Sequence, residues 1–238
     1  MPPLIEVRNL RYRYEDGTQA LNGVDFRLEE GESVALFGAN GSGKTTFVLH
    51  LNGLLTGEGS IEICGFPLRA ANRAAVRRNV GLVFQDSDNQ LFMPTVLEDV
   101  AFGPLNLGQD RDEALRRARA ALDTVGMGAA ASRAPYHLSA GEKKKVAIAG
   151  ILAMEPRILV LDEPTTFLDP PAQRSLADLL VRLPQAKILV THNTLLAEAV
   201  CDRAVFFESG VIAAEGKVND IVTRFGWDFN LERSNFGL

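Results

Sequence analysis

The sequence predicts an α/β fold with parallel core strands, an antiparallel β portion near the N-terminus and a helical insertion at about 87–155. Compact β-type runs at 157–161 and 187–191 are each followed by polar residues and then a helix-forming segment. That alternation is typical of parallel strands with helical crossovers. Short β-rich runs dominate the first 40 residues, and residues 95–154 favour helix. No internal repeat interrupts this pattern, so we expect one domain over 1–238, with its core at about 1–86 and 156–238.

The individual elements follow from local signals in chain order. Runs rich in β-branched and aromatic residues, separated by Gly-containing turns, predict strands at 4–8, 24–28, 33–37 and 61–64. A helix is expected from Lys44 to about Leu54, a turn at 65–67, and a buried strand at 80–85 that ends at the polar cluster 86–90. Within the insertion, the Ala- and Arg-rich segment 112–125 and the apolar segment 142–154 predict helices.

Composition narrows the class of protein. The chain has 238 residues, 46% hydrophobic and 23% charged, which is typical of a globular domain. A formal net charge of −5 argues against non-specific attraction to nucleic acid, so no nucleic-acid partner is expected. Cys64 and Cys201 have neither metal-type spacing nor a disulfide framework, as in a reducing compartment. Residues 1–11 lack a secretion signal and no apolar run is long enough for a membrane span, which predicts a cytosolic protein.

A glycine-rich segment between a predicted strand and a predicted helix has the pattern of a phosphate-binding loop. Gly38-Ala-Asn-Gly-Ser-Gly-Lys-Thr45 fits G-x-x-x-x-G-K-[ST] in the context that this motif requires. Glycines let backbone N–H groups converge on phosphate oxygens, and the following helix directs its positive end at the same anion. Lys44 is expected to reach the β- and γ-phosphates and the Thr45 hydroxyl to ligate Mg²⁺. The expected nucleotide contacts of this segment are Asn40, Gly41, Gly43, Lys44, Thr45 and Thr46.

The second half of this site follows the apolar run 158–161. Asp162 comes at the carboxyl end of the strand that this run predicts, where α/β proteins place ligand-binding groups. Asp162 can hold Mg²⁺ through its water shell. Glu163 is then placed to polarise a water for in-line attack on the γ-phosphate. Adjacent acidic residues after a strand usually lie in a solvated turn. Their occurrence together with the phosphate-binding loop favours a role in the nucleotide site instead.

Between these two stretches lies His137-Leu-Ser-Ala-Gly-Glu-Lys-Lys-Lys-Val146, and here the chain resembles the ATP-binding subunits of ABC transporters. The likeness covers nearly the whole chain. The family signature reads Leu-Ser-Gly-Gly-Gln, whereas this chain has Ala140 and Glu142 at two of the five positions. The resemblance implies that Ser139 and Gly141 touch the γ-phosphate held by an opposite subunit. From the residues alone, Ser139 and Glu142 form a capping box that opens a helix.

Other residues match the family in order along the chain. The resemblance implies that Tyr14 stacks on adenine, with Tyr12 as a close rival, and that Gln85 senses Mg²⁺ and the attacking water. It also implies that Asp169 lies in a loop that crosses the dimer interface, although Phe167 occupies a position where the family prefers a small residue. His192 resembles the histidine that contacts the γ-phosphate. His50 and His137 are assigned structural roles.

The resemblance further implies an ATPase that uses ATP and Mg²⁺ and works as a dimer, either a homodimer or a pair with a paralogue. Two head-to-tail copies would form two composite sites. The subunit would sit at the cytoplasmic face of the cell membrane, bound to integral membrane coupling and substrate-binding subunits. We expect a partner helix to dock in a groove at Leu91, Phe92 and Met93, beside Asp86 and Asp88; the alternative is that these residues pack into the helical insertion.

Narrower likenesses point to the energy-coupling-factor (ECF) branch of importers. Segments 49–54, 83–95, 100–106 and 144–150 resemble that branch, and Asp-Asn-Gln-Leu-Phe-Met-Pro-Thr95 is most similar to its cobalt and nickel subfamily. The chain also ends soon after the core, without the long C-terminal extension common in the vitamin group. The alternatives are the ATPase of a vitamin importer (for example for biotin), a soluble non-transport ABC ATPase, and a regulatory nucleotide-binding module without turnover.

Overall fold

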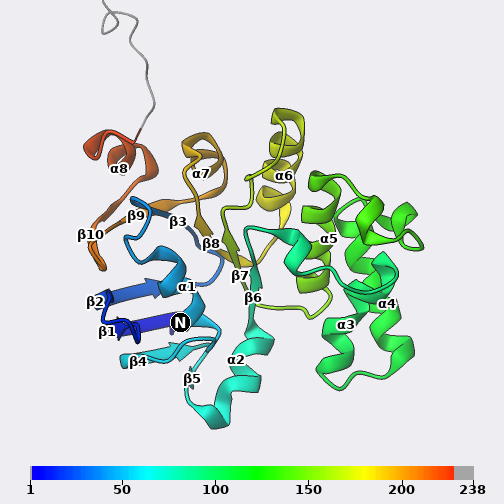
Figure 1. Cartoon of the computed structure of the whole chain (residues 1–238), viewed down its shortest axis with the longest axis horizontal. Helices are drawn as coiled ribbons and strands as arrows, with labels where there is room; N and C mark the ends of the chain where they lie inside the picture. Colours follow the sequence, from blue (N-terminus) through cyan, green and yellow to red (C-terminus); the bar gives the residue numbers. More distant parts are fainter. Residues whose placement is uncertain (1, 228–238) are drawn as a thin grey trace, which may run out of the picture.

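Two β-sheets and a group of helices make up the chain, as a computed structural model that describes residues 2–227 shows (Figure 1). The larger sheet has six strands in the order β10-β9-β3-β8-β7-β6, and the smaller has four in the order β2-β1-β4-β5. The expected α/β fold with an antiparallel portion is therefore confirmed. Met1 and residues 228–238, which belong to the expected domain, lie outside the described residues.

The strands are β1 (Ile5–Arg13), β2 (Gln19–Leu28), β3 (Ser33–Phe37), β4 (Glu58–Ile63), β5 (Phe66–Pro67), β6 (Val80–Val83), β7 (Ile158–Asp162), β8 (Ala186–Val190), β9 (Arg203–Glu208) and β10 (Val211–Gly216). The α-helices are α1 (Lys44–Leu51), α2 (Arg73–Asn79), α3 (Val96–Asn106), α4 (Arg111–Thr124), α5 (Ala140–Leu152), α6 (Pro170–Arg182), α7 (Thr194–Val200) and α8 (Val218–Arg224). Short 3₁₀ turns occupy Ala70–Asn72, Ser87–Asn89, Gly128–Ala130 and Pro135–His137.

The centre of the larger sheet is parallel and wholly buried. Strand β3 pairs with β8 and β9, β8 with β7, and β7 with β6, all in parallel, while β10 returns antiparallel to β9. Every residue of β3, β7 and β8 is buried, which is why these strands read as almost continuous apolar runs. In register, Val190 of β8 lies beside Leu36 of β3 and Asp162 of β7, so the carboxyl ends of the three strands meet at one edge.

The smaller sheet packs over α1, and its strand β2 also contacts β10 of the larger sheet. Phe47 of α1 lies between the two sheets: its ring centroid is 5.3 Å from that of Phe26 on β2 and 5.4 Å from that of Phe207 on β9. All three rings belong to one buried apolar cluster that spans both sheets. This packing fixes the helix that follows the glycine-rich loop, and so fixes the loop itself.

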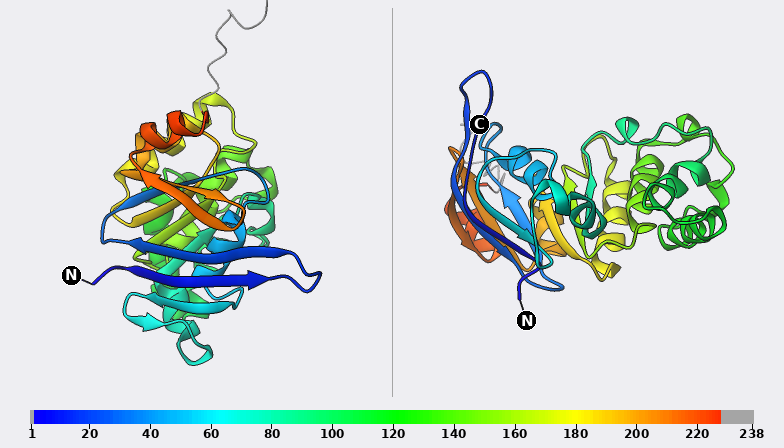
Figure 2. Two further views of the ribbon diagram at one scale, coloured as in Figure 1. Left: turned by 90° about the vertical axis from the view of Figure 1, so that its left-hand side faces the viewer. Right: turned by 90° about the horizontal axis from the view of Figure 1, so that it is seen from below.

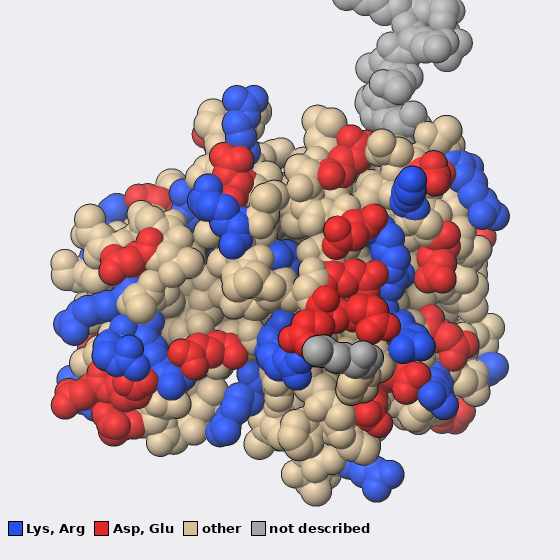
Figure 3. Space-filling model, turned by 180° about the vertical axis from the view of Figure 1, so that it is seen from behind, with Lys and Arg blue, Asp and Glu red and all other residues tan. Residues whose placement is uncertain are grey.

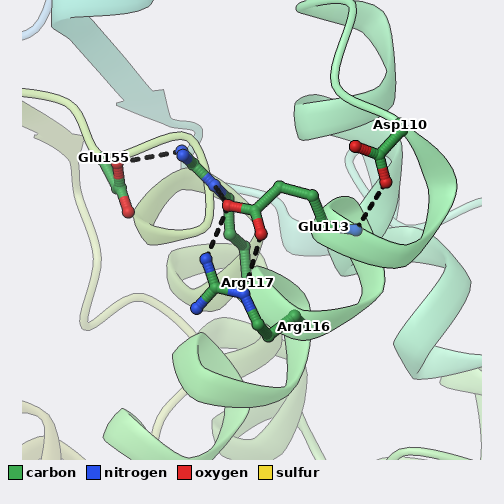
Figure 4. A network of polar contacts seen from close by, with 5 residues as sticks. All are labelled: Asp110, Glu113, Arg116, Arg117 and Glu155. Carbon is green, nitrogen blue, oxygen red and sulfur yellow. Dashed lines mark hydrogen bonds and ion pairs between the residues drawn. The ribbon is translucent and has the colours of Figure 1, made fainter.

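Helices α3, α4 and α5 gather at one end of the molecule, away from the β-rich end (Figures 1 and 2). Apolar residues such as Ala118 and Leu122 of α4 and Ile148 of α5 form their shared core. At the surface, Asp110 caps α4, and Glu113 pairs with Arg116 and Arg117 (Figure 4). Arg117 also reaches Glu155 beyond α5, at 2.9 Å. Because exposed ion pairs contribute at most about 1 kcal/mol, the apolar core stabilises this group of helices.

Several predicted boundaries differ from the structure. Helix α1 ends at Leu51 instead of about Leu54, because Gly53 adopts a left-handed backbone (φ 70°). Strand β6 ends at Val83 instead of Gln85, because Phe84 N–H donates to the Gln90 side chain rather than to a neighbouring strand. The elements β9, β10 and α8 were not anticipated from the sequence. No described helix is long and apolar enough to cross a membrane.

The surface carries both signs of charge. Figure 3 shows acidic side chains gathered on the rear face with basic ones interspersed among them. Arg203 forms ion pairs with two acidic residues: its guanidinium lies 2.6 Å from Glu32 and 3.3 Å from Glu215. These pairs link β9 to the turn before β3 and to β10.

Candidate functional site

A cavity of about 610 Å³ opens at the carboxyl edge of the central strands. It is lined by eleven of the residues expected from the sequence: Tyr14, Asn40, Gly41, Gly43, Lys44, Thr45, Thr46, Gln85, Asp162, Glu163 and His192. Sequence reasoning missed five further lining residues, Thr18, Gln19, Ala20, Thr166 and Val190. The first three belong to the β1–β2 turn and the start of β2, where nothing in the sequence signals a ligand. Residues from five separate stretches of the chain thus converge on one cavity.

Two glycines of the loop before α1 occupy positions where a side chain would not fit. Gly38 (φ 136°) and Gly43 (φ 108°) both have backbone conformations that L side chains rarely adopt. A Cβ atom on Gly38 would overlap the carbonyl of Phe207, and one on Gly43 would lie 2.6 Å from the carbonyl oxygen of Ala20. At these two positions the loop therefore passes too close to β9 and β2 for a side chain.

Lys44 lies at the base of the cavity with 6% of its surface exposed. Its ammonium group donates to the carbonyl oxygens of Gly38 at 2.6 Å and Ala39 at 2.9 Å. Burial lowers the pKa of Lys44, and the nearby carboxylates of Glu163 and Asp162 oppose that shift. A buried cation at the centre of a glycine loop and a helix N-terminus is suited to a polyphosphate anion.

Two oxygen ligands meet at the wall of the same cavity. The Thr45 hydroxyl donates to Asp162 Oδ2 at 3.2 Å, although 117 residues separate them in sequence. Burial raises the pKa of Asp162, while the Thr45 hydrogen bond and the charge of Lys44 lower it. A hydroxyl and a carboxylate are hard oxygen donors of the kind that Mg²⁺ prefers, and the Gln85 amide lines the same cavity. The residues present therefore fit a magnesium ion carried with a nucleotide.

Glu163 is held in a strained conformation with a nearly buried side chain. Its φ of 43° is left-handed, and its N–H donates to the Val190 carbonyl at 2.9 Å, which fixes it at the end of β8. Burial raises the pKa of Glu163 to about 7, assisted by the negative charge of Asp162 and opposed by the His192 N–H and by Lys44. A carboxylate with a pKa near neutrality, in a cavity, is suited to accept a proton from water.

His192 closes the far side of the cavity. Its Nε2 lies 3.3 Å from Asn40 Oδ1 and 3.3 Å from Glu163 Oε1. Burial, together with the charge of Lys44, lowers the pKa of His192, so the ring is neutral at pH 7. A neutral ring can donate one hydrogen bond from Nε2 toward the space between Asn40 and Glu163.

The two tyrosines near the N-terminus occupy different places. The Tyr14 hydroxyl is hydrogen-bonded to Thr46 Oγ1 at 2.9 Å, and its ring lines the cavity. Tyr12 instead packs edge-on against Tyr14 and the buried His50, with ring centroids 5.0 Å and 4.8 Å away. His50 Nδ1 is bonded to the Thr46 carbonyl at 2.7 Å, within the core. Tyr14, rather than Tyr12, faces the cavity.

Comparison with known proteins identifies the family. The family model described as "ABC transporter" matches residues 21–166, more than half of the chain. The chain belongs to the ATP-binding proteins of ABC transporters. It is an ATPase, as expected from the sequence.

Relatives of this ABC ATPase bear more specific names. An energy-coupling factor transporter ATP-binding protein, EcfA, of Methanosphaera stadtmanae is 47% identical over 229 residues, which cover 94% of this chain and 82% of the relative. CbiO1 of Clostridium perfringens, described as part of the ABC transporter complex cbiONQ, matches with a TM-score of 0.85 and 34% identity over 99% of this chain and 98% of the other. The ATP-binding cassette MJ0796, in a dimeric post-hydrolysis state bound to ADP and Pi, matches with a TM-score of 0.81 and 28% identity over 90% and 98%.

Three expected contact residues of the ABC ATPase lie outside the cavity. Ser139 caps α5 and forms the predicted capping box: its Oγ accepts from Glu142 N–H at 3.3 Å, and its N–H donates to Glu142 Oε2 at 2.8 Å. Gly141 lies in the first turn of α5, close to Ala172 of α6. Asp169 caps α6. None of the three is among the residues that line the cavity.

A buried lysine that the sequence reasoning did not single out connects α5 to Gln85. Lys144 is 2% exposed, and its ammonium group donates to the carbonyl oxygens of Phe84 at 3.0 Å and Gln85 at 2.7 Å. Burial lowers the pKa of Lys144 to about 8, opposed by the charges of Asp86 and Asp162. A lysine among three consecutive lysines looks like a solvated charge run, so the sequence carried no signal for this role.

We expect Lys144→Met to break the contact between α5 and the Gln85 backbone. The variant removes two hydrogen bonds from a charged donor to the Phe84 and Gln85 carbonyls, so stability should fall by about 1–3 kcal/mol and ATP turnover should fall with it. The matched control is Lys143→Met on the same helix: Lys143 pairs with the exposed Asp88, and the loss should stay below about 1 kcal/mol. Chemical denaturation and a phosphate-release assay measure both effects; equal behaviour of the two variants would contradict the role of Lys144.

Proposed function

We propose that this chain is the ATP-binding and hydrolysing subunit of an ECF importer and that the imported solute is a cobalt or nickel ion. The observation that carries the ATPase part is the convergence of the glycine loop, Lys44, Asp162 and Glu163 on one cavity. The names of EcfA and CbiO1 support the ECF branch, and the cbiONQ complex supports the metal ion. A vitamin importer is the alternative that solute uptake would distinguish.

The proposed mechanism assigns a task to each part of the cavity. Backbone N–H groups from Asn40 to Thr46 and the ammonium group of Lys44 bind the triphosphate, and the Tyr14 ring stacks on adenine. Thr45, Gln85 and Asp162 would hold the magnesium ion of Mg-ATP, which would supply positive charge to the bound phosphates. Glu163 accepts the proton of the attacking water, and neutral His192 donates a hydrogen bond to the γ-phosphate.

Each site is completed by a second copy or a paralogue. Ser139, Gly141 and Asp169 lie on the surface formed by the starts of α5 and α6, so they do not reach the cavity of their own chain. In the proposed head-to-tail dimer, the positive end of α5 and the Ser139 hydroxyl contact the γ-phosphate bound to the opposite chain. The dimeric MJ0796 cassette supports this arrangement.

An apolar groove supports docking on a membrane partner. Its volume is about 390 Å³, and it runs between β6, α3 and α5. Leu91 and Phe92 line it as expected, whereas Met93 is not among its lining residues. Phe92 is 62% exposed, and its ring meets that of Phe102 edge-on with centroids 4.9 Å apart.

The occupant we propose is a helix of the integral membrane coupling subunit, with an apolar face and one hydrogen-bond donor. Asp99, 8% exposed, lines the groove; its Oδ1 accepts from the N–H groups of Phe92 and Met93, whereas its Oδ2 has no partner among the described residues. A donor from the docked helix would satisfy that buried oxygen. Docking would place the ATPase at the cytoplasmic face of the cell membrane, beside a coupling and a substrate-binding subunit.

Glu163→Gln should reduce ATP turnover by about 10²–10⁴-fold while nucleotide binding is retained, because an amide cannot accept the proton of the attacking water. The matched control is Glu155→Gln, since Glu155 also has a left-handed backbone (φ 55°) but lies on the surface. Phosphate release and nucleotide titration give the two readouts. Undiminished hydrolysis by Glu163→Gln would remove this residue from its proposed role.

Ser139→Phe should abolish turnover without weakening ATP binding to the monomer, because the bulky ring would block the contact with the opposite site. The substitution also removes a helix cap worth about 1 kcal/mol. Thr95→Phe provides the control, because Thr95 forms the same capping box on α3. If both variants lose turnover equally, the effect is one of helix stability and the proposed contact is wrong.

Phe92→Glu should separate the ATPase from its membrane partners while its affinity for Mg-ATP stays unchanged, because a charge replaces the exposed apolar centre of the groove. The membrane subunits that co-purify with the wild-type chain in detergent are first identified and reconstituted in liposomes. ATP-dependent uptake of Co²⁺ or Ni²⁺ by the wild-type complex, lost in the variant, is the expected result. Uptake of biotin but of neither ion would favour the vitamin alternative.

A further inference from the structure

The single tryptophan of the chain lies against the histidine of the ATPase site. Trp227 follows α8, and its ring is stacked on the His192 ring with centroids 5.7 Å apart and an interplanar angle of 27°. This spacing is that of an offset aromatic stack. The Nε2 edge of His192 lies near Asn40 and Glu163, whereas the indole stacks on a face of the ring.

The indole is itself held in place by a stack of aromatic rings. Trp227 meets the buried Phe206 of β9 edge-on at 5.3 Å, and Phe206 is stacked on Phe225 at 3.7 Å with an angle of 4°. The backbone N–H of Trp227 donates to the Val222 carbonyl at 2.8 Å, in the turn that follows α8. These contacts attach Trp227 to the apolar cluster that also contains Phe37 of β3.

The His192 side chain has few other restraints. About 43% of it is exposed, and its polar neighbours lie at 3.3 Å, which is long for a hydrogen bond. A neutral imidazole can therefore rotate about its χ angles unless one face is covered. Among the described residues, Trp227 is the aromatic partner that supplies this cover.

We propose that Trp227 is a positioning residue: by stacking on His192 it holds Nε2 toward Asn40 and Glu163, and so couples α8 to ATP hydrolysis. This inference rests on the role proposed above for His192. Trp227 touches neither nucleotide nor reacting atoms in this account. Its effect falls on the orientation of His192, and therefore on turnover rather than on binding of ATP.

The first test compares turnover of Trp227→Leu, Trp227→Phe and Phe225→Leu, in the full chain with its co-purified membrane subunits. Loss of one aromatic stack should lower kcat by about 2- to 12-fold in Trp227→Leu, with the KM for ATP unchanged within about twofold. Trp227→Phe, which keeps a ring, should restore most of the activity. Phe225→Leu is the control, because Phe225 stacks on Phe206 but not on His192.

The second test is spectroscopic and uses the full chain alone. An imidazolium ring in contact with indole quenches its fluorescence, so emission from Trp227 should fall as His192 is protonated below pH 6.5, since burial lowers its pKa. His192→Ala should remove this transition. Glu163 and Lys44 face His192 from the cavity, and Arg224 lies on α8 near Phe225. Recording the transition in Glu163→Gln distinguishes titration of His192 from that of Glu163.

Each outcome decides a different claim. Wild-type kcat in Trp227→Leu, or a fluorescence transition that persists in His192→Ala, would overturn the inference about Trp227. Equal losses of turnover and melting temperature in Trp227→Leu and Phe225→Leu would also overturn it, because they indicate a merely structural role. Undiminished turnover in His192→Ala would instead overturn the proposed role of His192. If Trp227→Leu does not fold, Trp227→Phe and the fluorescence comparison still decide.

Discussion

The parallel register of β3, β8 and β7 is the constraint on which the rest of the site depends. Val190 pairs with Leu36 on one side and with Asp162 on the other, so the strand that leads into the glycine loop and the strand that ends at the acidic pair finish at one edge. Thr45 and Asp162 can then share a hydrogen bond across 117 residues. Packing of Phe47 between Phe26 and Phe207 fixes α1, and with it the loop, against that edge.

Burial shifts the pKa values of the ionisable groups in and beside the site. Desolvation disfavours the charged form of every group, so one physical cause raises the pKa of Glu163 to about 7 and lowers the pKa of Lys144 to about 8 and that of His192. The carboxylate becomes a better proton acceptor at neutral pH, whereas the imidazole stays neutral. The charge of Lys44 opposes the rise in the pKa of Glu163 and adds to the fall in the pKa of His192. A shift in strand register would therefore disturb both geometry and protonation.

The fold class, the glycine loop and the acidic pair were predicted from the sequence because their signals are local, whereas Tyr14, Gln85 and His192 were assigned through the family resemblance. A glycine loop between strand and helix, and an acidic pair after an apolar strand, are each readable within ten residues. Lys144 and Trp227 were missed because their roles depend on contacts with Gln85, 59 residues away, and with His192 across the sheet. The end of β6 was misplaced because the Gln90 side chain takes the hydrogen bond of Phe84 N–H.

The central claim is that the loop from Gly38 to Thr45 binds the triphosphate through Lys44. Calorimetric titration of Mg-ATP into the purified full chain, compared with Lys44→Ala, tests this claim most directly. We expect the wild type to bind one nucleotide per chain and the variant to bind at least about tenfold more weakly, since it loses a charge-assisted hydrogen bond to phosphate. Equal affinity in the two proteins, or no binding by the wild type, would contradict the account.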